Sequence, residues 1–127
     1  MLFLTLILGC NSYNTNVLDS VLARNKFKYC SQLSECEVDD LDVSGDDEEL
    51  ITEISIDLCM DEFEDALEIA ELSGCKAETR DYINCYTKNA PVYSCYDDWE
   101  DYEKDYSEYR EELCWQEIEK YNSCEIF

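Results

Sequence analysis

The sequence predicts an all-α fold: a small, disulfide-stabilised bundle of about four helices with one acidic loop. Three observations lead to this class. One proline, three glycines and almost no alternating apolar pattern in 127 residues disfavour sheets. Several segments carry apolar residues at helical spacing. Nine cysteines in so short a chain indicate a disulfide framework around a single core.

The first helix and the acidic loop follow from the pattern of the N-terminal third. Val17–Leu33 carries apolar residues at helical spacing and is expected to be a helix. Glu35–Glu49 is rich in acids and has no periodic apolar face, so we expect a solvated loop there. Ser44 and Asp47 approximate a capping box, which indicates the start of the next helix.

Two further helices are expected in the middle of the chain. Leu50–Ser73 shows the spacing of a helix with one buried stripe, and Gly74 provides a C-terminal stop. A shorter helix is expected over Glu78–Lys88, ending before Pro91.

The last helix has the clearest pattern. Asp97 and Glu100 form an N-terminal capping box. Steps of three and four residues then define a seam that we expect to pack into the core, formed by Trp99, Tyr102, Tyr106, Tyr109 and Leu113. The stripe then drifts to Cys114, Ile118 and Tyr121. Tyrosine sulfation in this acidic context is the alternative to core packing.

The N-terminus indicates secretion. Residues 1–12 form a short uncharged apolar run followed by small residues, as in a signal peptide, which leaves residues 13–127 as one secreted domain. The run is too short to span a membrane. Two alternatives are a lipobox around Cys10 and a reduced cytosolic protein; no basic residue precedes the run, which argues against the lipobox.

Removal of Cys10 leaves an even number of cysteines. The expected disulfide residues are Cys30, Cys36, Cys59, Cys75, Cys85, Cys95, Cys114 and Cys124. Eight cysteines allow 105 connectivities, and the sequence leaves the pairing open. No C-x-x-C is present, which argues against a zinc site.

Charge limits the partners and the chemistry. The chain has 32 acidic and 9 basic residues, a net charge of −23, so nucleic acid and anionic membranes are not expected partners. An extracellular, cationic protein or peptide is the expected partner. No histidine is present to serve as a general base, and we expect no enzymatic activity.

One acidic motif suggests a metal. The run from Asp40 through Asp42 to Gly45 matches the first half of a calcium-binding EF-hand loop. The second half fails, because Ile51 stands where a bidentate Glu belongs. The candidate calcium ligands are Asp40, Asp42, Asp46 and Glu48. No other cofactor is expected.

The C-terminal third resembles a known family. A Cys, acidic residues and a Trp (Cys95, Asp97, Asp98, Trp99) open a long amphipathic helix that is followed by Cys114. This arrangement is similar to the C-terminal part of a nematode secreted cysteine-rich domain family of unknown function. The resemblance implies a secreted, disulfide-bonded helical domain and assigns no catalytic or binding residue.

Together these patterns predict a secreted, non-enzymatic, acidic disulfide-rich interaction module. Two alternatives stay open: a low-affinity calcium-binding acidic protein, and a carrier of a small apolar ligand between helices.

Overall fold

The computed structural model describes the backbone of residues 2–40 and 46–124 and the side chains of residues 19–38 and 47–124. In these ranges the chain forms five α-helices, a 3-10 turn and a π-helical turn, with no strand. The elements are α1 (Leu2–Asp40), α2 (Asp46–Leu72), α3 (Lys76–Asn89), η1 (Tyr93–Cys95), α4 (Trp99–Glu108), η2 (Tyr109–Leu113) and α5 (Trp115–Ser123). The predicted all-α, disulfide-stabilised bundle is confirmed.

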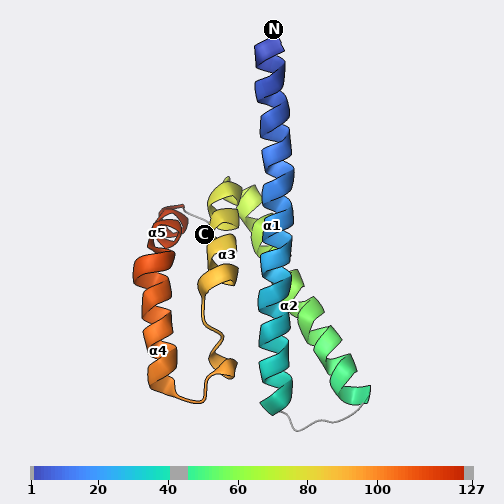
Figure 1. The fold of residues 1–127 in the computed structure, drawn as a ribbon, viewed down its shortest axis with the longest axis vertical. Coiled ribbons are helices and arrows are strands. Elements are labelled where there is room, and N and C mark those ends of the chain that lie inside the picture. Colours follow the sequence, from blue (N-terminus) through green and yellow to red (C-terminus); the bar gives the residue numbers. More distant parts are fainter. Residues whose placement is uncertain (1, 41–45, 125–127) are drawn as a thin grey trace.

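Helix α1 is the axis of the bundle (Figure 1). Helices α2 and α3 pack along it and against each other, and η1 also contacts it. Helix α5 and the π-helical turn η2 pack on α3, while α4 lies at the outer edge. The N-terminal part of α1 extends beyond the other helices (Figure 1). No helix in the described part of the chain has the length and apolar character needed to cross a membrane.

The four disulfides connect these layers. The eight expected cysteines pair as Cys30–Cys59, Cys36–Cys95, Cys75–Cys124 and Cys85–Cys114. The first joins α1 to α2, and the second joins α1 to η1. The third and fourth fasten the two ends of α5 to the start and the middle of α3.

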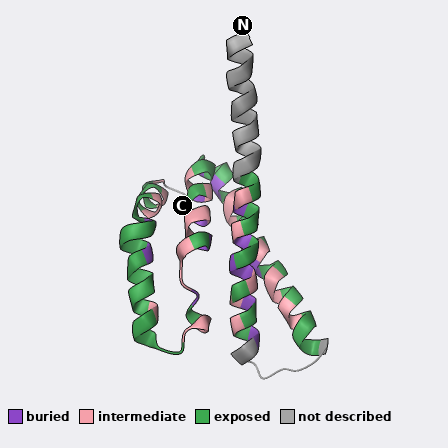
Figure 2. Cartoon of the chain, in the orientation of Figure 1, coloured by how far each residue is buried: buried purple, intermediate pink, exposed green. Residues whose placement is uncertain are grey.

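The core is correspondingly rich in cysteine and tyrosine. Its buried centre consists of Tyr29, Cys30, Cys59 and Val92. Buried positions are few and lie mostly along α1 and α3, whereas most of α2 and α4 is exposed or partly exposed (Figure 2). The aliphatic content is too low for a larger apolar core, which explains the reliance on covalent links.

The expected loop over Glu35–Glu49 is wrong in its first part, because α1 continues to Asp40. Cys30, Ser34 and Val38 are buried and spaced by four residues, so one face of this segment packs on the bundle despite its acids. The hydroxyl of Ser34 donates a hydrogen bond to the backbone oxygen of Thr52 at 3.1 Å. Tertiary packing therefore overrides the loop-like composition.

The end of α2 agrees with the prediction. Gly74 adopts a left-handed φ of +78°. The amide of Cys75 donates to the carbonyl of Ala70 at 2.8 Å, and the amide of Gly74 donates to that of Glu71 at 3.2 Å. These two bonds form a Schellman motif, which turns the chain directly into α3.

The single long C-terminal helix is wrong in two respects. It is divided into α4, η2 and α5, and the amide of Cys114 donates to the carbonyl of Tyr109 at 2.8 Å across the π-helical turn. The extra residue in this turn brings Cys114 onto the buried side, where it reaches Cys85. The N-cap is Asp98 and not Asp97: its carboxylate accepts a hydrogen bond from the amide of Glu100 at 2.9 Å.

The aromatic seam is mostly outside the core. Of its five residues only Tyr109 is buried, while Trp99 and Leu113 are about half exposed, at 55% and 48%. The rings do contact one another along α4, and Tyr102 also packs against Tyr93 of η1. The spacing correctly identified one face of a helix, but only its C-terminal part, at Tyr109, is buried against α3.

Candidate ligand-binding groove

An apolar groove with two adjoining chambers lies among α1, α2, α3 and α5. The aromatic chamber has a volume of about 490 Å³, and its wall includes Tyr29, Phe63, Thr79, Tyr82, Tyr86 and Tyr121. The aliphatic chamber has a volume of about 440 Å³, and its wall includes Glu37, Ile51, Ile54 and Leu58. Both walls share Leu33, Cys59 and Glu62, so the chambers meet at these residues.

Helical spacing and one disulfide position this groove. Tyr29 and Leu33 are four residues apart on α1, and Cys59 and Phe63 are four residues apart on α2, so each pair shares a face. The Cys30–Cys59 disulfide holds the two helices together beside the point where the chambers meet. This covalent link sets the separation of α1 and α2 at that point.

The aromatic chamber has a hydrogen-bonded wall. The hydroxyls of Tyr29 and Tyr86 lie 2.9 Å apart, and their ring centroids lie 5.2 Å apart. The rings of Tyr82 and Tyr121 stack with centroids 4.4 Å apart. Burial, and then the hydrogen bond with Tyr86, raises the pKa of Tyr29 well above its ordinary value. This side chain stays neutral at physiological pH, so it adds no charge to the chamber.

One polar group in this wall lacks a partner. Thr79 is 2% exposed, and its hydroxyl has no hydrogen-bond partner among the described residues. A buried hydroxyl without a partner destabilises a fold by about 1–3 kcal/mol. The other buried threonine of α3, Thr87, donates to the carbonyl of Ile83 at 2.8 Å. Thr79 therefore lies in the chamber wall with its hydroxyl oxygen covered by protein atoms and not exposed to the cavity.

The surface around the groove is negatively charged. No basic residue lines either chamber, whereas Glu37 and Glu62 do. Every charged residue of α2 is acidic, and all of those with described side chains are exposed. Only two ion pairs occur in the described part of the chain, Lys76–Glu71 and Arg80–Asp19, both at 3.7 Å. Most carboxylates beside the groove are therefore not neutralised by neighbouring bases.

An exposed aliphatic row borders the groove. Leu50, Ile54 and Leu58 follow one another at four-residue spacing on α2 and are 56%, 51% and 60% exposed. Ile54 and Leu58 also line the aliphatic chamber. Singly exposed aliphatic residues are ordinary, but a contiguous row beside an apolar cavity marks a surface suited to binding.

The predicted calcium ligands lie mostly outside the described residues. This applies to Asp42, and to the side chains of Asp40 and Asp46 at the ends of α1 and α2. Glu48 is exposed in the first turn of α2. The calcium site stays a prediction.

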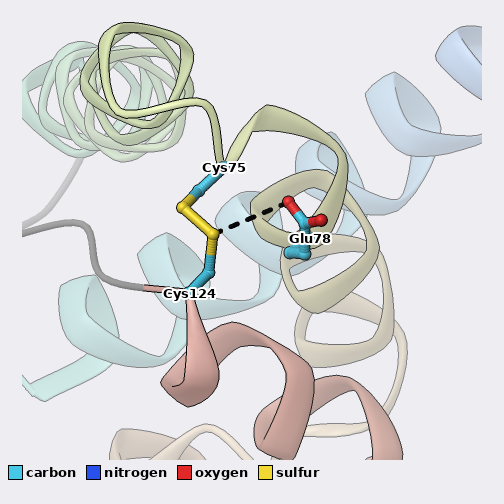
Figure 3. Close-up of side chains that lie close together, drawn as sticks. All are labelled: Cys75, Glu78 and Cys124. Carbon is cyan, nitrogen blue, oxygen red and sulfur yellow. Dashed lines mark hydrogen bonds between the residues drawn. A yellow bond between two sulfur atoms is a disulfide. The ribbon is translucent and has the colours of Figure 1, made fainter.

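Two other groups bring sulfur and carboxylate atoms together: Cys75, Glu78 and Cys124, and Cys85, Cys114 and Glu117. Figure 3 shows the first, where the Sγ atom of Cys124 lies 3.8 Å from Oε2 of Glu78. A disulfide sulfur carries no proton to donate and no thiolate charge, so this is a close contact only. In the disulfide form neither group offers the thiolate ligands that a metal site of this type needs.

Comparisons with known proteins assign no function to this chain, so a functional assignment depends on the groove. No family model, curated protein or solved structure matches this chain. The resemblance of the C-terminal third to a nematode secreted family stays a prediction.

Proposed function

We propose that this protein is a secreted, non-enzymatic interaction module whose groove binds a cationic, amphipathic segment of an extracellular protein or peptide. The observation that carries the proposal is the exposed row of Leu50, Ile54 and Leu58, which lies between exposed carboxylates on a helix without a single base. A segment with apolar residues on one face and Lys or Arg on its flanks complements both features.

The covalent structure supports the extracellular part of the proposal. Four disulfides in a chain of this size are typical of proteins from oxidising compartments. They also support the non-enzymatic part of the proposal. Eight of the nine cysteines are paired and cannot act as thiol nucleophiles, and the sequence holds no histidine to act as a general base. The groove residues offer binding surface and hydrogen-bonding groups.

The test uses a synthetic helical peptide with leucines on one face and lysines on the other. We expect saturable binding by calorimetry, with affinity falling at least about tenfold as ionic strength rises from about 0.01 M to about 0.15 M. The matched peptide with glutamates in place of lysines should not bind. Salt-independent affinity, or equal binding of both peptides, would contradict the proposal.

Two alanine variants locate the surface. Ile54→Ala with Leu58→Ala should weaken binding about tenfold, since both side chains lose apolar contact with the peptide. Leu72→Ala is the matched control: Leu72 also lies on α2 and is 91% exposed, but it lines neither chamber. Equal loss in both variants would mean that the peptide binds α2 without using the groove.

A second candidate function is carriage of a small apolar ligand. The aromatic chamber favours it, because about 490 Å³ falls in the usual range for small-molecule pockets. A neutral lipophilic fluorescent probe should then bind saturably, and Ala66→Trp in the chamber wall should abolish binding. A fluorescence signal that rises linearly with probe concentration, without saturation, would exclude ligand carriage.

A further inference from the structure

A ladder of exposed aromatic rings follows α4, at the outer edge of the bundle, and continues onto η1 (Figure 1). Trp99 and Tyr106 of α4 and Tyr93 of η1 are 55%, 37% and 62% exposed. The rings are contiguous: the Tyr93 and Trp99 centroids lie 5.7 Å apart, and Tyr102 contacts both Trp99 and Tyr106, at 5.5 and 5.8 Å. We call these four residues the aromatic ladder. A contiguous patch of large exposed rings indicates an interaction surface.

The surface around the aromatic ladder is acidic. Residues 97–108 include seven acids and a single base, Lys104, and all seven acids are exposed. None of these carboxylates takes part in the two ion pairs of the described part of the chain. A second copy of this chain, with a net charge of −23, would be repelled. Charge complementarity therefore favours a cationic occupant.

One of these carboxylates stands beside the rings. Glu103 follows Trp99 by four residues and precedes Tyr106 by three, and residues at these spacings are neighbours on a helix surface. Glu108 follows Trp99 by nine residues, about two and a half turns, which places it on the opposite side of α4. A cation on the aromatic ladder would therefore reach Glu103 and not Glu108.

A guanidinium group already lies on this ladder. The Cζ atom of Arg110 lies 5.8 Å from the centroid of the Tyr106 ring, within the range of a cation–π contact. A guanidinium group is planar and weakly hydrated, so it stacks on aromatic faces and donates two parallel hydrogen bonds to a carboxylate. A lysine ammonium is compact and strongly hydrated and does neither as well. Exposed rings beside a carboxylate thus favour arginine over lysine.

We propose that the aromatic ladder binds an arginine side chain of a cationic protein or peptide, with the guanidinium group stacked on Trp99 and donating hydrogen bonds to the carboxylate of Glu103. This site is separate from the groove, because no residue of α4 or η1 lines either chamber. It goes beyond the proposed function, since it gives the protein a second cation-binding surface with a different side-chain preference.

The probe is an acetylated, amidated hexapeptide of alternating glycine and arginine. It is titrated into the Trp115→Phe variant, which leaves Trp99 as the only tryptophan of the chain. We expect a saturable change in Trp99 fluorescence, with affinity at least about fivefold higher than that of the matched glycine–lysine peptide. The matched peptide with citrulline should not bind, because it carries no charge. Equal affinity for the arginine and lysine peptides, or a change without saturation, would overturn the proposal, because either would indicate attraction to the acidic surface alone.

Matched variants locate the arginine site in two-dimensional NMR titrations. Trp99→Leu should weaken binding of the glycine–arginine peptide about fivefold, and Trp99→Phe, which keeps a ring, should weaken it less. Glu103→Gln should weaken binding about threefold, whereas Glu108→Gln, which removes the same charge from the opposite side of α4, should change it less than about 1.5-fold. Wild-type affinity in Trp99→Leu, or equal weakening by the two glutamine variants, would overturn the assignment.

Unfolding and binding in the groove can be distinguished from loss of the arginine site. Trp99 is half exposed, so the Tm of Trp99→Leu should stay close to that of the wild type. Should Trp99→Leu unfold, Trp99→Phe and Glu103→Gln carry the test. Ile54→Ala with Leu58→Ala should leave the affinity for the glycine–arginine peptide unchanged, and a loss in this variant would place the peptide in the groove and overturn the proposal.

The two proposals fail separately. If the leucine–lysine helical peptide binds through Ile54 and Leu58 while the glycine–arginine peptide does not bind, the arginine site fails and the proposed function stands. If the glycine–arginine peptide binds through Trp99 but the helical peptide does not bind, the groove function fails and the arginine site stands.

Discussion

The hydroxyl groups of Tyr29 and Tyr86 lie 2.9 Å apart and form a hydrogen bond between α1 and α3. Tyr29 is 8% exposed, so its hydroxyl depends on this partner. Phe63 of α2 packs edge-on against Tyr29, with ring centroids 6.0 Å apart. The three central helices thus meet at one hydrogen bond surrounded by aromatic rings.

Removal of one partner should destabilise the protein more than removal of both. Tyr86→Phe leaves the buried hydroxyl of Tyr29 unpaired, so we expect the free energy of unfolding to fall by about 1–3 kcal/mol. The double variant Tyr29→Phe with Tyr86→Phe should recover part of this loss in urea denaturation followed by circular dichroism. Tyr93→Phe is the control, because the Tyr93 ring is 62% exposed. Strictly additive losses would contradict this account.

The N-cap of α4 gives a second prediction. Asp98→Ala removes the carboxylate that accepts from the amide of Glu100, which should lower the free energy of unfolding by about 1 kcal/mol. Asp97→Ala is the matched control, because Asp97 is an adjacent exposed acid and should change stability little. Thermal unfolding of both variants measures the difference. Equal losses would mean that Asp97 contributes as much as Asp98.

Alkaline pH should weaken the fold through its buried tyrosines. Burial, and then hydrogen bonding, raises the pKa of Tyr29 and of Tyr109, and the same causes raise the pKa of Tyr96 to about 12. An unfolded tyrosine ionises near pH 10, before these folded ones. Their contribution to stability is therefore complete below about pH 10 and is lost as the pH rises through the folded pKa values.

Urea denaturation at several pH values tests the predicted loss of stability at alkaline pH. The free energy of unfolding should be steady below about pH 10 and fall above it, and the decline should be shallower in Tyr29→Phe. An ultraviolet titration should show late formation of tyrosinate in the native protein, because Tyr29 and Tyr109 keep their protons. If the free energy of unfolding declines equally in the wild type and in Tyr29→Phe, ionisable groups other than Tyr29 cause the decline.

The Cys36–Cys95 disulfide gives a fourth prediction. It closes a separation of 59 residues, so the double variant Cys36→Ala with Cys95→Ala should lose about 4 kcal/mol in urea denaturation without reductant. The same link holds η1 against α1, and η1 packs against α4 through Tyr93 and Tyr102. Hydrogen exchange should therefore quicken in α4. A double variant with wild-type stability would contradict this prediction.

The parts of the fold that could be predicted depend on local signals. Gly74 ends α2 because its positive φ suits a residue without Cβ, and this signal is visible in the sequence. The extension of α1 also had a local signal, the four-residue spacing of Cys30, Ser34 and Val38, but a cysteine and a serine are weak markers of a buried face. Composition outweighed spacing there, and the loop prediction was wrong for residues 35–40.

The groove could not be predicted because it depends on contacts between distant residues. Periodicity predicted helices over Leu50–Ser73 and Glu78–Lys88 and placed Tyr121 on the stripe of the last helix, but it does not say which helix faces meet. That information lies in the disulfide connectivity, which eight cysteines leave open. For the same reason the α4 seam was misassigned: spacing shows that Trp99 and Tyr106 share a face, and only the arrangement of the helices shows that these side chains stay partly exposed.

The way the disulfides overlap along the chain has a consequence for proteolysis. The loops closed by Cys30–Cys59, Cys36–Cys95 and Cys75–Cys124 overlap, so every peptide bond from Cys30 to Cys124 lies within at least one of them. A single cut by a protease in this interval leaves two fragments that stay joined as one molecule. Such a nick becomes visible only after reduction, and the protein can be cleaved once without releasing either fragment.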